Sequence, residues 1–150
     1  MNIYKTPDSS NQEPENRQCK PINAICYGLL ISVVLTMIVS IIEVMIFAII
    51  IAVTQGSENI SADFMTGNSL FLIIDLIVTF GCLFYAGKIT GKYAFGQELK
   101  FGLIVALLTL LIYVLIYFTI DSTENYPVWY DLMTYINIFV AILWGAKSVK

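Results

Sequence analysis

Two acidic side chains lie inside apolar stretches of this chain, and their type and position suit them to carry charge. Glu43 occurs in "SIIEVM" and Asp75 in "LIIDLI". A carboxylate near mid-bilayer costs about 2.5–3.5 kcal/mol on the insertion scale, and such residues commonly mark ion pathways or proton relays. The cation nearest to Asp75 along the chain is Lys88, roughly 20 Å away if the segment is a helix. Because no salt bridge is in reach, we expect at least one acid to be protonated at neutral pH.

Three other polar residues of the apolar stretches are candidate hydrogen-bond partners for these acids. An acid pair with such partners is suited to binding a proton or a cation. The predicted intramembrane proton or cation site therefore comprises Glu43, Asp75, Asn137, Thr109 and Tyr113.

A second candidate motif is the segment "GKITGKYAFGQELK", residues 87–100. A phosphate-binding loop requires G-x-x-x-x-G-K-[ST] between a strand and a helix. Here Ala86 occupies the first glycine position, and Tyr93 follows Lys92. We therefore expect no nucleotide site. The segment is interpreted as a flexible inner loop whose glycines turn the chain between two helices and whose lysines contact anionic lipid.

Composition removes most catalytic and metal chemistry. The chain has no histidine, which excludes serine–histidine and cysteine–histidine catalysis and the commonest metal ligand. Its three cysteines, Cys19, Cys26 and Cys82, form no C-x-x-C pair. We expect a protein that is not an enzyme and that holds no cofactor and no metal.

The elements that must position the acids are apolar helices. The chain is 58% hydrophobic and 13% charged, with a mean hydropathy of +0.79. Apolar runs cover about residues 24–53, 69–87, 101–120 and 129–146, and a run of roughly 20 residues crosses the hydrocarbon layer as a helix. The prediction is an all-α, polytopic membrane protein: a flexible, polar cytoplasmic tail (1–21), then an antiparallel bundle of four transmembrane helices (22–150).

The basic residues predict an orientation. They precede the first run, lie between the second and third, or follow the fourth: Lys5, Arg17, Lys20, Lys88, Lys92, Lys100, Lys147 and Lys150. The other two loops contain no lysine or arginine. The positive-inside rule then predicts a multi-pass protein of the inner (cytoplasmic) membrane with both termini in the cytoplasm.

Each apolar run also carries small or polar residues at helical spacing on one face. These stripes predict a seam along which the helices pack through close approach and interhelical hydrogen bonds. The alternative is that the stripes line a polar pathway. The predicted packing seam includes Ser32, Thr36, Ser40, Thr79, Ala106, Ala141 and Gly145.

The first residues add a resemblance. The opening "MNIYKTPDSS" resembles the M-N-x-Y-x-[TA]-P-x-S head of many small, uncharacterised multi-pass inner-membrane proteins of bacteria. The resemblance covers the first ten residues or so. It implies an inner-membrane location and carries no known activity.

Three classes of function are compatible with these observations. The favoured one is a membrane component without catalytic machinery that acts as a structural, accessory or regulatory element through helix–helix contacts. Its partners would be the lipid bilayer and other membrane proteins or copies of itself, with no nucleic acid and no nucleotide. The alternative is a small proton- or cation-coupled transporter that uses Glu43 and Asp75. A membrane-embedded enzyme would need an acid pair in a recognisable motif, and none is present.

Overall fold

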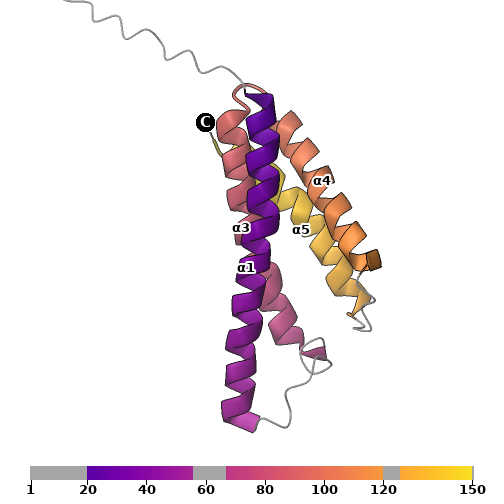
Figure 1. Ribbon diagram of the computed structural model, residues 1–150. Helices are drawn as coiled ribbons and strands as arrows, with labels where there is room; N and C mark the ends of the chain where they lie inside the picture. The colour runs from indigo at the N-terminus through magenta and orange to yellow at the C-terminus, as the bar shows by residue number, and fades with distance from the viewer. Residues whose placement is uncertain (1–19, 56–66, 120–125, 150) are drawn as a thin grey trace, which may run out of the picture.

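The computed structural model describes residues 20–55, 67–119 and 126–149, and long helices dominate this part of the chain (Figure 1). The helices are α1 (Pro21–Gln55), α3 (Ser69–Tyr93), α4 (Glu98–Thr119) and α5 (Val128–Lys147). All four are long and apolar enough to cross a membrane, and they pack against one another. The predicted all-helical membrane fold is confirmed. Most of the predicted tail, residues 1–19, lies outside the described residues.

Local signals explain where the helices begin. α1 begins at Pro21, and proline suits a first helical position because its missing N–H would have no partner there. The side chain of Asn68 accepts hydrogen bonds from the backbone N–H groups of Leu70, at 3.0 Å, and Phe71, at 3.3 Å. These bonds satisfy free donors at the start of α3. Pro127 directly precedes α5.

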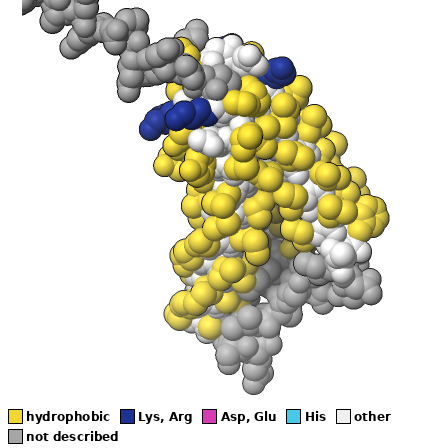
Figure 2. Space-filling model, turned by 45° about the horizontal axis from the view of Figure 1, so that its top comes forward, with side chains coloured by type: hydrophobic (Ala, Val, Ile, Leu, Met, Phe, Trp, Pro, Cys, Tyr) yellow, Lys and Arg dark blue, Asp and Glu magenta, His cyan; other side chains and the backbone are white. Residues whose placement is uncertain are grey.

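The lysines of the described residues gather at one end of the bundle, here called the basic end: Lys20, Lys88, Lys92, Lys100 and Lys147. Figure 2 shows lysine or arginine side chains at that end of the visible face and hydrophobic side chains over most of the rest. The start of α1 is tied to the end of α3 there, because the N–H of Lys20 donates to the carbonyl of Tyr93 at 3.0 Å. The opposite end, where α3 and α5 begin, is called the far end.

The closest helix pair runs parallel. Gly87 of α3 lies directly against the backbone of Ile142 in α5, and Gly91, one turn on, lies against Ala146. Residue numbers rise together along this contact, so α3 and α5 run in the same direction. Helices that are consecutive in the chain run antiparallel, as the bundle prediction requires.

Glycines make this close approach possible. A Cβ atom on Gly87 or Gly91 would meet α5 backbone, and one on Gly145 would meet the backbone of Phe84 and Lys88. Gly28 likewise faces Thr90 of α3 and Val105 of α4. Such small residues let membrane helices approach until their backbones touch. All these contacts lie in the half of the bundle nearer the basic end, which is therefore tightly closed.

One expectation about this region is wrong. Gly87 and Gly91 do not turn the chain in a flexible loop, because α3 continues to Tyr93. Their backbones are helical, and they serve packing. The turn between α3 and α4 spans residues 94–97, where Gly96 has a φ of 83°, a value that glycine adopts without the strain of a side chain.

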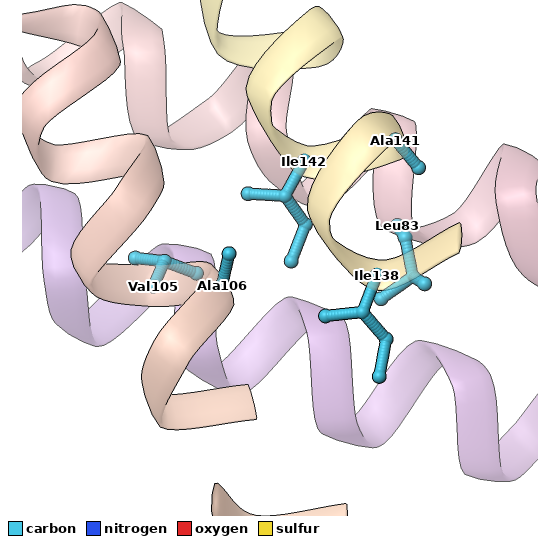
Figure 3. Close-up of a cluster of buried hydrophobic side chains, with 6 residues drawn as sticks. All are labelled: Leu83, Val105, Ala106, Ile138, Ala141 and Ile142. Atoms are coloured by element: carbon cyan, nitrogen blue, oxygen red, sulfur yellow. The ribbon is translucent and has the colours of Figure 1, made fainter. Parts of the chain in front are cut away.

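The central core joins three helices (Figure 3). Leu83 comes from α3, Val105 and Ala106 come from α4, and α5 contributes Ile138, Ala141 and Ile142. In Figure 1, α4 and α5 lie against the upper part of α1 and α3, and they diverge from α1 towards the far end. The ribbons of α1 and α4 thus lie closer together near the basic end than towards the far end.

Candidate functional site

Asp75 is held by a tyrosine from the neighbouring parallel helix. The hydroxyl of Tyr130, in the first turn of α5, donates a hydrogen bond to Oδ2 of Asp75 on α3. Tyr130 is buried, in a cluster with Phe71 and Leu72, against which Phe47 and other side chains pack. This apolar cluster places the phenol beside the carboxyl group and ties the start of α5 to α3.

Glu43 lies at the same depth as Asp75 on the adjacent helix. The rings of Phe47 and Phe71 pack with centroids 4.7 Å apart, and Gly28 faces Thr90 farther along the same antiparallel pair. Glu43 is one turn before Phe47, and Asp75 is one turn after Phe71.

The carboxyl group of Glu43 is sheltered but makes no hydrogen bond. Both of its oxygens are buried, and neither has a partner among the described residues. A buried acceptor without a partner is costly, and a single unsatisfied polar group costs roughly 1–3 kcal/mol. Within residues 20–55, 67–119 and 126–149, Glu43 is therefore the residue whose buried side-chain oxygens have no hydrogen-bond partner.

The other predicted site residues do not join the two acids in hydrogen bonds. Asn137 donates from Nδ2 to the backbone carbonyl of Leu76 at 2.9 Å, and so links α5 to α3. Thr109 shares a hydrogen bond of 3.0 Å with Ser32, which links α4 to α1 nearer the basic end. Tyr113 packs edge-on against the ring of Tyr135, with centroids 6.4 Å apart. The structure thus divides the five predicted residues among separate contacts.

The expected seam residues occupy several kinds of position. Ala106, Ala141 and Gly145 are buried where helices meet, and Ser32 is buried in its bond to Thr109. Thr36 bonds back to the carbonyl of Ser32 in its own helix, at 2.5 Å. The remaining two, Ser40 and Thr79, are partly exposed.

The sequence does not predict the roles of three residues in the contact between α3 and α5. Tyr130 stands in "WYD" at the start of an apolar run, a position typical of an aromatic residue at the membrane boundary. Its register with Asp75 depends on how α3 and α5 align, which no local pattern encodes. Gly87 and Gly91 belong to the segment that the sequence predicts as a loop, although their four-residue spacing is itself the pattern of a helix-packing face.

The arrangement is suited to holding a proton or a small cation, since two carboxyl groups and a phenol lie at one depth. It contains no histidine and no thiolate cluster, and no group of three potential ligands that could hold a metal ion occurs among the described residues. No protein-family model, curated protein or solved structure matches this chain.

Proposed function

We propose that this protein is a non-catalytic component of the inner membrane that acts as a structural, accessory or regulatory element through contacts between helices. The observation that carries the proposal is that most polar side chains on the inward faces of the helices already make hydrogen bonds within the bundle. Such groups stabilise an assembly and leave little to line a transport route.

The hydrogen bonds of these faces support this interpretation. Ser32 and Thr109 bond each other, and the side-chain amide of Asn137 donates to a backbone carbonyl of α3. The hydroxyl groups of Thr90 and Thr134 donate hydrogen bonds to backbone carbonyls one turn earlier in their own helices, at 3.0 and 2.9 Å. Near the basic end, glycine contacts bring the backbones of α3 and α5 together.

α1 offers the surface on which a partner would pack. It has 35 residues and α5 has 20, which correspond to about 52 Å and 30 Å of helix. A smaller share of α1 is buried than of the other three helices. Apolar side chains line one exposed face of α1 at intervals of three or four residues. This exposed α1 face comprises Leu30, Val34, Met37, Ile41, Met45 and Ile49.

Site-directed photo-crosslinking tests the proposal in native membranes. A photoreactive residue replaces Ile41 on the exposed α1 face, and a matched control replaces Leu107 on α4, which is similarly exposed at 50% against 59%. We expect a discrete protein adduct from position 41 and predominantly lipid adducts from position 107. Lipid adducts alone from both positions would contradict a function through helix contacts.

We also propose that both termini lie in the cytoplasm. The described lysines all lie at the basic end, and lysine-rich ends of membrane proteins face the cytoplasm. A reporter fused after Lys150 should be active only in a cytoplasmic form, and a tag within residues 56–66 should be accessible from outside spheroplasts. The opposite pattern would reverse the orientation.

A proton- or cation-coupled transporter is the second candidate. It is favoured by the shared depth of Glu43 and Asp75 and by the unsatisfied oxygens of Glu43. Purified protein in liposomes would then show a pH-dependent flux of protons or cations. Glu43→Gln and Asp75→Asn would abolish this flux without loss of folding. If the wild-type protein gives no flux above empty liposomes, this second function is rejected.

A further inference from the structure

A lysine pair and an aromatic cluster adjoin at the basic end, on the side of α3 and α5. Trp144 of α5 packs edge-on against the rings of Phe80 and Phe84 of α3, with centroids 6.0 and 6.2 Å away. Lys88 follows Phe84 by one helical turn, and Lys92 follows by another. These residues, Phe80, Phe84, Lys88, Lys92 and Trp144, are called the lysine–tryptophan surface.

Contacts of the backbone bring the two halves of this surface together. Gly145, the neighbour of Trp144, lies directly against the backbone of Phe84 and Lys88. Trp144 is 60% exposed although its ring contacts two others, and both lysine side chains are exposed. Among the described residues, the surface therefore presents two exposed cations beside an aromatic shelf formed by Phe80, Phe84 and the exposed Trp144.

The surface places aromatic rings deeper in the membrane and lysines nearer its edge, and a phospholipid has the same order of apolar and charged parts. A phospholipid has acyl chains that suit the aromatic shelf, a glycerol region at the depth that tryptophan prefers, and a phosphate at the depth of the lysines. Charge decides between lipid types, since two lysines favour a headgroup with net negative charge. The described acid closest along the chain, Glu98, already accepts a hydrogen bond from the N–H of Gly96 at 2.9 Å.

We propose that the lysine–tryptophan surface is a binding site for one anionic phospholipid of the phosphatidylglycerol type. Its phosphate lies between Lys88 and Lys92, and one acyl chain lies on Trp144 and Phe84. A lysine near an anionic membrane surface contributes about 1 kcal/mol. We therefore expect roughly a fivefold preference over phosphatidylcholine for each lysine engaged.

Quenching of tryptophan fluorescence by brominated lipid tests the site directly. The chain has two tryptophans, so Trp129→Phe leaves Trp144 as the reporter. The protein is reconstituted in phosphatidylcholine vesicles that contain a small mole fraction of either brominated phosphatidylglycerol or brominated phosphatidylcholine. We expect stronger quenching by the brominated phosphatidylglycerol. Equal quenching by the two lipids would overturn the proposal.

Lysine variants locate the effect. In the Trp129→Phe background, Lys88→Gln with Lys92→Gln should bring quenching by phosphatidylglycerol down to the phosphatidylcholine level. Lys100→Gln is the control, because Lys100 is exposed and lies about 200° around α4 from Gly102, which faces α5. If Lys100→Gln lowers the preference as much as either Lys88→Gln or Lys92→Gln, the attraction is general and no site exists.

A second reporter keeps the test decisive if the glutamine variants fail to insert. Trp144→Phe leaves Trp129 as reporter at the far end, at the start of α5. This reporter should show no preference for brominated phosphatidylglycerol. An equal preference at both tryptophans would overturn the proposed site.

Discussion

Gly87→Ala perturbs the tightest contact in the bundle. A Cβ atom at this position would lie 2.8 Å from the carbonyl carbon and 2.9 Å from the Cα of Ile142, and closer still to its oxygen. These atoms belong to backbone, so no change of rotamer can relieve the clash. α3 and α5 would have to separate, which loosens the packing of Leu83 against Ile138 and Ile142.

The expected cost follows from that geometry. Forcing an extra carbon into a well-packed interface typically costs about 1–3 kcal/mol. The contact here is with backbone at both Gly87 and Gly145, so we expect a value in the upper part of that range. Because the two glycines share one interface, the effects of Gly87→Ala and Gly145→Ala should not be additive.

Gly81→Ala is the matched control. It lies in the same helix, and its Cβ would meet no atom within 4 Å. Alanine is favoured over glycine within a helix by up to about 1 kcal/mol, so this change should leave the stability equal or raise it. Both variants are unfolded from mixed micelles by increasing the fraction of denaturing detergent, with helix content followed by circular dichroism. If Gly87→Ala is as stable as Gly81→Ala, the close α3–α5 contact described above is wrong.

The remaining predictions use the same unfolding assay. Tyr130→Phe removes the hydrogen bond to Asp75 and should lower the free energy of unfolding by about 0.5–1.5 kcal/mol, whereas an unchanged value would mean that the phenol does not hold the acid. Ser32→Ala and Thr109→Val should show a coupling of about 0.6 kcal/mol in a double-mutant cycle, and additive effects would argue against their shared bond. Gly96→Ala should cost roughly 1 kcal/mol, because the φ of 83° is unfavourable for alanine, and a neutral result would place the turn in another conformation.

Much of the architecture is readable from the sequence because its signals are local. The hydropathy of each apolar run by itself favours lipid, so the spans could be located without knowing which helices touch. The positions of the lysines likewise predict which end of the bundle is basic. The faces that carry Ser32, Ala106, Ala141 and Gly145 follow from helical periodicity alone, and these residues are buried.

The candidate site could not be assembled in this way. Periodicity places Glu43, Asp75 and Asn137 on faces of their helices, but it does not set the depth of one helix against another. The pairing of Asp75 with Tyr130 depends on the parallel alignment of α3 and α5. That alignment is decided by glycine contacts between segments that are more than 50 residues apart in the chain.

The sequence by itself thus determined the four apolar helices of the described residues and the gathering of their lysines at one end. Only the tertiary structure decided that α3 and α5 are the closest pair, that Gly91 belongs to a helix, and that Glu43 has no hydrogen-bond partner among the described residues. The physical reason is that partition into lipid depends on each segment separately. Helix order, rotation and relative depth depend instead on the fit between surfaces that the chain brings together only when it folds.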